Sequence, residues 1–232
     1  MLRMVFCDVD GTLLPKAADT LADETIQLLR RLTDRGVTVV IASGRPYAQL
    51  KALFGPLFYR LVFLCMDGAL VMHKNCVLYK KRLMKCKTRD LIARYGGAAI
   101  YGREQVYCVG NTPVAGKRVR WPEEIPEDYL KVELPAGQVS GLHESFRIAY
   151  QNERTTELVA AGADKGAAAR VIMQKFGVAP EQAIAFGDGD NDIPLLCAVG
   201  HPYRMKDSLC TGFGDLPTAE SVEAVLRKQF GL

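Results

Sequence analysis

The sequence lacks the features of a membrane-spanning, secreted or disulfide-bonded protein. No window approaches the roughly 18 uninterrupted apolar residues of a membrane-spanning helix. An apolar segment follows the first residues almost directly, without the basic stretch and cleavage site of a secretory signal. The seven cysteines include no C-x-x-C pair and no metal-ligand spacing, which favours free thiols in a reducing compartment. We therefore expect a cytoplasmic protein that does not bind a membrane.

Several widespread catalytic motifs are also missing. The phosphate-binding pattern G-x-x-x-x-G-K-[ST] does not occur, and Ser43 is not part of a G-x-S-x-G elbow. The three histidines, His73, His143 and His201, have no evident nucleophile beside them. These absences argue against P-loop chemistry and against a serine triad. The chain also has no internal repeat and no low-complexity segment.

The composition is that of a globular protein with an ample core. Of the 232 residues, 49% are hydrophobic and 24% are charged, and the formal net charge of +4 slightly favours small anionic partners. Basic residues gather once, in a stretch without an aromatic residue to stack on a base: Lys80, Lys81, Arg82, Lys85, Lys87 and Arg89. We interpret this stretch as a solvated linker or helix face and expect no nucleic-acid partner. The sequence leaves the oligomeric state open.

Both ends of the chain alternate apolar strands with amphipathic helices. The strands are expected at 2–8, 37–43, 60–68 and the start of 181–192, and the helices at 22–36, 44–54, 164–177 and 218–230. Short connections between such elements are typical of right-handed crossovers, and continuous apolar runs indicate strands buried on both faces. The sequence therefore predicts an α/β fold with a Rossmann-like parallel-sheet core.

The middle of the chain has a different pattern. The segments 69–73 and 76–80 flank Lys74-Asn75, which suggests a hairpin. From 81 to 157, short strands separated by Gly, Pro and Asn occur together with helical stretches near 87–95 and 138–145. We expect an α+β insert with an antiparallel sheet at 81–157, inside a core made of residues 1–80 and 158–232.

Acidic residues follow the predicted strands of the core. Asp8 and Asp10 follow the first strand, and Asp188, Asp190 and Asp192 follow the strand that begins at 181. Residues two apart on a strand point to one face, and ligands bind beyond the carboxyl ends of parallel strands. These carboxylates are therefore expected to converge on one crevice, together with Ser43 and Lys165.

In such a cluster either some carboxylates are protonated or a divalent cation binds. Two carboxylates about 4 Å apart at an effective dielectric of about 20 repel by roughly 4 kcal/mol. A hard cation with few protein carboxylates and open positions for water and phosphate describes Mg²⁺ better than Ca²⁺. An EF-hand that begins at Asp188 fails, because Ile193 would replace its glycine and Val199 its bidentate glutamate. With a cation, a lysine and a serine at the mouth of the sheet, the natural substrate group is a phosphate, and a carboxylate can serve as nucleophile.

Four segments resemble, in order, the signature motifs of the haloacid dehalogenase-like superfamily of phosphatases. They are "DVDGTLL" at 8–14, "ASGRP" at 42–46, "DKG" at 164–166 and "FGDGDNDIPLL" at 186–196. The pattern is most similar to the Cof-type subgroup, in which an α/β cap is inserted between the second and third motifs. The resemblance spans nearly the whole chain and implies a catalytic core with a cap that selects the substrate.

The resemblance also implies roles for individual residues. Asp8 would attack phosphorus and form an aspartyl-phosphate, and Asp10 would protonate the leaving oxygen and later deprotonate water. The phosphoryl group would be held by Ser43, Gly44, Arg45, Lys165 and Asn191. Mg²⁺ would be bound by Asp8, the backbone carbonyl of Asp10, Asp188 and, directly or through another ligand, Asp192. Asp190 is expected to be a loop residue.

The chain departs from the subgroup at several points. Asp67-Gly68 replaces a common Asn-Gly, which either adds a negative charge near the cleft or only forms a turn. The segment 197–208 is short and lacks the usual methionine-glycine-asparagine run of the family. The insert is small for the subgroup, so we expect a shallower or more open pocket, as in small phosphoglycolate or sugar-phosphate phosphatases. Arg147, Lys117 and Arg118 are weak candidates for binding an acidic substrate tail. The alternatives to a phosphomonoesterase are a phosphomutase acting on a phosphosugar and a catalytically silent metabolite-binding regulator.

Overall fold

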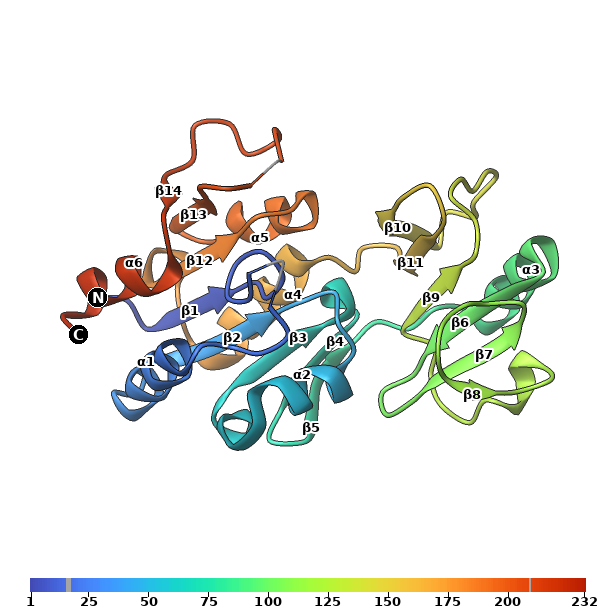
Figure 1. Ribbon diagram of the computed structural model, residues 1–232, viewed down its shortest axis with the longest axis horizontal. Helices are drawn as coiled ribbons and strands as arrows, with labels where there is room; N and C mark the ends of the chain where they lie inside the picture. The colour runs from blue at the N-terminus through green and yellow to red at the C-terminus, as the bar shows by residue number, and fades with distance from the viewer. Residues whose placement is uncertain (16–17, 209) are drawn as a thin grey trace.

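Two β-sheets organise the chain (Figure 1). The computed structural model describes residues 1–15, 18–208 and 210–232. Within them the larger sheet has the strand order β14-β13-β12-β1-β2-β3-β4-β5. Its parallel strands are β1 (Met4–Cys7), β2 (Thr38–Ala42), β3 (Val62–Cys65), β12 (Ala183–Gly187), β13 (His201–Met205) and β14 (Thr218–Ala219).

The edge of this sheet is completed by the predicted hairpin, β4 (Leu70–His73) and β5 (Cys76–Lys80). Lys74 and Asn75 have φ angles of 51° and 64°. Two consecutive left-handed residues are typical of a turn whose twist matches the flanking strands. The hairpin is therefore confirmed, although Lys-Asn is a weak turn signal.

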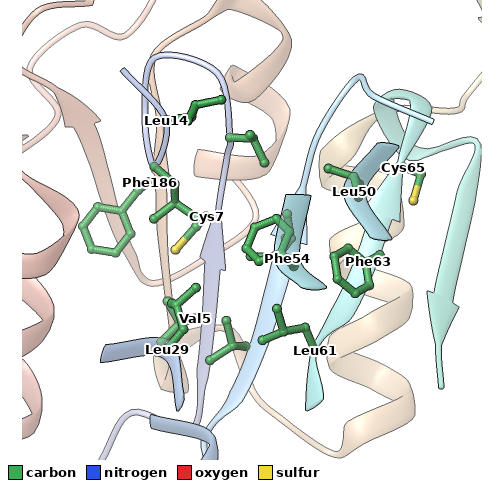
Figure 2. Close-up of a cluster of buried hydrophobic side chains, with 14 of the residues drawn as sticks. Val5, Cys7, Leu14, Leu29, Leu50, Phe54, Leu61, Phe63, Cys65 and Phe186 are labelled. Carbon is green, nitrogen blue, oxygen red and sulfur yellow. The ribbon is translucent and has the colours of Figure 1, made fainter. Parts of the chain in front are cut away.

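Helices cover both faces of the larger sheet. Successive residues of a strand point to opposite faces, so each strand contributes side chains to two buried clusters. Val5 and Cys7 pack with Leu29 and Phe54 in one buried cluster (Figure 2), on the face of α1 (Asp23–Asp34), α2 (Tyr47–Phe54) and α6 (Val222–Phe230). Met4 and Phe6 belong to a second cluster, which includes residues of α4 (Lys165–Phe176) and α5 (Ile193–Leu196). Burial on both faces explains why the strands have continuous apolar runs.

The end of the chain differs from the expected helix at 218–230. Thr218 and Ala219 pair with β13 instead and form the edge strand β14. The helix α6 begins after Ser221, whose side chain accepts a hydrogen bond from the backbone N–H of Ala224. A serine at this position satisfies an N–H group that the first helical turn leaves unpaired, so the helix begins there.

The second sheet lies beside the first, away from the two chain termini (Figure 1). Its strand order is β10-β11-β9-β6-β7-β8 among the described residues, and its pairs are antiparallel except for β7 with β8. It has a buried core of its own, which includes Leu91 and Val132. The elements of this part, which we call the cap, are α3 (Lys85–Tyr95), β6 (Gly97–Tyr101), β7 (Val106–Gly110), β8 (Lys117–Arg118), β9 (Lys131–Leu134), β10 (Phe146–Gln151) and β11 (Thr156–Ala160).

The cap departs from the sequence pattern in two places. The expected helix near 138–145 does not form, and Gly141, in the middle of this segment, has a φ of 60°, which is outside the right-handed helical region. The strand β11, at Thr156–Ala160, was not expected, and it extends the cap sheet past residue 157. The division into domains at 80 and 158 therefore stays a prediction.

None of the helices in the described part of the chain has the length and apolar content that a bilayer crossing requires.

The aromatic cluster around Phe63 gives a test of the core. Replacing Phe63 by alanine is expected to lower the free energy of unfolding by about 3–5 kcal/mol, because a large buried side chain is lost and a cavity remains. The Phe63 ring is buried and lies 4.8 Å from that of Phe58 and 5.6 Å from that of Phe54, centroid to centroid. Urea unfolding measures the change. Tyr59→Ala, at a residue that is 53% exposed, is the control; an equal loss at both positions would contradict the packing described above.

Candidate active site

The predicted site residues gather at the carboxyl edge of the parallel strands. Asp8 directly follows β1, Ser43 follows β2, and Asp188 follows β12. A cavity of about 440 Å³ opens there, between the core and the cap. Its lining includes these predicted residues: Asp8, Asp10, Gly44, Arg45, Asp188 and Asn191. Because β1 ends at Cys7, Asp10 lies in the following loop rather than on a strand face, yet it reaches the same cavity.

A buried lysine joins two of the carboxylates. Lys165 has no exposed surface, and its Nζ lies 2.7 Å from Oδ1 of Asp8 and 2.6 Å from Oδ1 of Asp192. The other oxygen of Asp192 accepts hydrogen bonds from the backbone N–H groups of Asp188 and Gly189. Both oxygens of Asp192 are thus engaged, and its side chain positions Lys165 and the loop after β12.

Burial and neighbouring charges shift the pKa values of Asp8 and Lys165. The pKa of Asp8 is raised well above its usual range, first by burial and then by the charge of Asp192, while Lys165 opposes the shift. Burial alone would lower the pKa of Lys165, but the charges of Asp192 and Asp8 outweigh it and raise this pKa above its ordinary value. Lys165 therefore stays protonated and provides positive charge inside the site.

The same carboxylates form a group that fits a hard cation. Asp8, Asp188 and Asp192 each offer an oxygen atom, and these atoms lie within 4.8 Å of one another. Gly11 has a φ of 86°, and a Cβ on it would lie 2.2 Å from Oδ2 of Asp188, so only glycine allows this approach. The hydroxyl of Ser208 donates to the backbone carbonyl of Asp188 at 2.5 Å and fixes the loop. An all-oxygen donor set of this size matches the chemistry of Mg²⁺.

Asp10 has a different environment from Asp8. Its side chain is 55% exposed, and Arg45 donates to both of its oxygens, from Nε at 2.8 Å and from Nη2 at 2.5 Å. The hydrogen bond to Asp10 is the main cause of the raised pKa of Arg45. Arg45 therefore holds a carboxylate here, and its predicted contact with phosphate stays a prediction.

Ser43 and Asn191 are also engaged with protein groups. The Ser43 hydroxyl oxygen is buried and accepts a hydrogen bond from the backbone N–H of Arg45 at 3.1 Å. Asn191 donates from Nδ2 to Oδ1 of Asp67 at 2.8 Å. Asp67 is 2% exposed, has a φ of 52° and lines the cavity, so it both forms a turn and adds negative charge to the cleft.

This geometry can be compared with known proteins. A sequence model of the haloacid dehalogenase-like hydrolases matches residues 5–131 and 136–209. The chain belongs to this family. A phosphoglycolate phosphatase from Methanospirillum hungatei is similar to this hydrolase, with 24% identity over 99% of this chain and 97% of its own length.

Solved structures share the fold of this hydrolase. SMU.1108c from Streptococcus mutans has a TM-score of 0.86 at 19% identity, over 100% of both chains. The haloacid dehalogenase subclass IIB sugar phosphatase BT4131 has a TM-score of 0.82 at 19% identity, over 99% of both chains. The predictions of the family, of the α/β fold with its inserted cap, and of a phosphatase are confirmed.

The cap of this hydrolase contributes residues that the sequence did not reveal. Tyr101, Lys131, Tyr150 and Glu157 also line the cavity, together with the core residues Pro46, Gln49 and Gly189. No motif marks the four cap residues, because their direction depends on strand pairing within the cap. In contrast, Arg147 donates from Nε to the carbonyl of Ala163 at 2.6 Å and is not part of the described lining.

The remaining basic candidates and Asp190 have local partners. Lys117 lies over the Tyr107 ring, and Arg118 donates to the carbonyls of Gly110 and Thr112. Asp190 accepts a hydrogen bond from the Cys210 thiol and is not part of the carboxylate group of Asp8. These contacts support structural rather than substrate-binding roles for all three.

The charge of Lys165 can be tested by its removal. In a chelator at neutral pH, Lys165→Met is expected to lower the free energy of unfolding by about 3–5 kcal/mol, because two buried carboxylates lose their counter-charge. The deficit should shrink as the pH falls towards about 4, since the folded state then binds the proton on Asp8 more tightly than the unfolded state does. Lys175→Met, at an exposed position of the same helix, is the control. Equal stability of the two variants across this range would contradict the ion-pair assignment.

Proposed function

We propose that this hydrolase is a Mg²⁺-dependent phosphomonoesterase that releases phosphate from a small phosphorylated metabolite through an aspartyl-phosphate intermediate. The observation that supports this most is the position of Asp8. Its carboxylate is paired with Lys165 at 2.7 Å, belongs to an oxygen cluster with Asp188, and lines a cavity between core and cap. A nucleophile needs this combination of a fixed direction and compensating charge.

In the proposed first step, an oxygen of Asp8 forms a bond to phosphorus while the bond to the leaving alcohol oxygen breaks. Lys165 stays charged and offsets the negative charge that gathers on the phosphoryl oxygens. Asp10 gives its proton to the leaving oxygen and then takes a proton from the water that hydrolyses the aspartyl-phosphate. The exposure of Asp10 in the cavity supports this role, because its carboxylate is accessible to a leaving group and to water.

The phosphoryl group is proposed to contact Ser43, Gly44, Arg45, Lys165 and Asn191. Asp8, the carbonyl of Asp10 and Asp188 are proposed to hold Mg²⁺, with Asp192 in support because its oxygens are already hydrogen-bonded. A bound Mg²⁺ would neutralise the carboxylates and polarise the phosphoryl oxygens.

The relatives support a small metabolite as the substrate. One is named a phosphoglycolate phosphatase, and a structural neighbour is named a sugar phosphatase. We further propose a cytoplasmic location, since all seven cysteines are free thiols.

The nucleophile assignment is tested by Asp8→Asn. Phosphate release from a panel of phosphomonoesters, with and without Mg²⁺, is expected to fall by roughly 10,000-fold or more in this variant, because the amide cannot form the covalent intermediate. Asp190→Asn, which changes an exposed carboxylate of the neighbouring loop, should keep its activity. Equal activity of wild type and Asp8→Asn would contradict the proposal, and transfer of phosphate between positions of one sugar would favour a phosphomutase.

The acid–base assignment is tested by Asp10→Asn. With an alkyl phosphate, kcat is expected to fall by about 100- to 10,000-fold, because the leaving alkoxide is no longer protonated. With p-nitrophenyl phosphate, whose leaving group needs no proton, we expect a rapid burst of nitrophenol followed by slow turnover. Rapid-mixing absorbance measures the burst, and its absence together with an equal loss on both substrates would contradict the assignment.

A further inference from the structure

The cap side of the cavity, where the proposed function places the leaving group, is lined by Tyr101, Lys131, Tyr150 and Glu157. Lys131 is 4% exposed, although it is the cation that the cap contributes to the described lining. Its Nζ lies 2.8 Å from Oε2 of Glu157, 3.2 Å from the carbonyl oxygen of Gly44 and 4.5 Å from the centroid of the Tyr101 ring. An ammonium has three N–H donors. Two are directed at oxygens and the third faces an aromatic ring, so Lys131 has no donor left for a substrate.

Two carboxylate oxygens on this side of the cavity are free to accept hydrogen bonds. Oε1 of Glu157 and Oδ2 of Asp67 accept no hydrogen bond from any described residue. Neither is among the buried polar atoms that lack a partner, so both reach open space in the cavity. Arg45 and Asn191 already donate to Asp10 and Asp67. The described lining therefore presents carboxylate oxygens and aromatic rings, and its free side-chain donors include the neutral groups of Gln49 and Tyr150 and the remaining N–H groups of the paired Arg45.

The charge of Asp67 also acts on Glu157 directly. Burial is the main cause that raises the pKa of Glu157; Lys131 opposes this, and Asp67 adds to it. Asp67 and Glu157 bring two carboxylates to this side of the cavity and Lys131 brings one ammonium, which leaves an excess of negative charge there. The two cations of the described lining, Arg45 and Lys131, are already paired with Asp10 and Glu157, so a substrate carboxylate placed there would be repelled.

From this arrangement, and resting on the function proposed above, we propose that Glu157 determines specificity by holding Lys131 and by presenting a free acceptor, so that the enzyme takes uncharged, hydroxyl-rich leaving groups and rejects carboxylate-bearing ones. Hydroxyl donors of a sugar satisfy the free oxygens of Glu157 and Asp67, and a sugar ring can pack on Tyr101 and Tyr150. Of the two substrate types expected from the sequence, this favours a sugar phosphate over phosphoglycolate.

The test compares kcat/KM for glucose 6-phosphate and for phosphoglycolate. Wild type should prefer glucose 6-phosphate. In Glu157→Gln the pair loses its negative charge, so kcat/KM should rise about tenfold for phosphoglycolate and fall about tenfold for the sugar phosphate. Glu144→Gln, which removes a carboxylate at an exposed position of the cap outside the described lining, is the control and should keep the wild-type ratio.

A second variant separates specificity from structural support. Lys131→Met leaves Glu157 unpaired. The ratio of kcat/KM for glucose 6-phosphate to that for phosphoglycolate should therefore rise above the wild-type ratio, opposite to the change in Glu157→Gln. If the two residues only supported the fold, kcat/KM for both substrates would change in the same direction in each variant, and that result would overturn the proposal. A wild-type preference for phosphoglycolate would overturn it as well.

The two proposals fail in distinguishable ways. If wild type releases phosphate from p-nitrophenyl phosphate in an Asp8-dependent manner but shows neither the preference nor the shift, the role of Glu157 is wrong and the phosphomonoesterase stands. If no ester is hydrolysed, the phosphomonoesterase itself is wrong, and the specificity proposal falls with it.

Discussion

The ammonium of Lys165 is the group on which the arrangement of the acidic site depends. It has no exposed surface and lies within 2.7 Å of two carboxylates that would otherwise repel each other in a poorly solvated place. The fold fixes its position firmly. Asp164 caps α4 by accepting from the N–H of Ala167, and Gly166 packs so closely that a Cβ would lie 2.1 Å from the carbonyl oxygen of Pro194. Close contact between α4 and the start of α5 is therefore what brings Lys165 to Asp192.

The division between Asp8 and Asp10 follows from the same geometry. They are separated by one residue, yet one is buried against Lys165 and the other is half exposed and held by Arg45. Their different environments hold one carboxylate in a fixed direction and leave the other open to the cavity, and the roles proposed for them rest on this difference. The strand ends before Asp8, and the loop that follows it lets Asp10 turn towards Arg45.

The fold of the core could be predicted from the sequence because the patterns that indicate it are local. Continuous apolar runs, short connections and acids at strand ends determine a parallel sheet and the edge at which its polar residues meet. The fold of the cap was predicted less completely. Its strand β11 depends on pairing between distant residues, and the helix expected near 138–145 does not form. The partners of Arg45 and Asn191 were also not evident, because Asp10 and Asp67 meet them only in the folded chain.

The Lys131 and Glu157 pair shows why substrate selection is hidden from the sequence. In the register of β9 and β11, Lys131 is opposite Val159 and Glu157 is opposite Glu133, so the two charges are diagonal neighbours on one face. A shift of one residue would turn one of them away from the cavity. Lys131 also donates to the carbonyl of Gly44, in the loop after β2, so the same ammonium joins the cap to the phosphate end of the site. The charge that a leaving group meets is consequently set by the register of the cap sheet and by its contact with the core, rather than by any segment that a motif could mark.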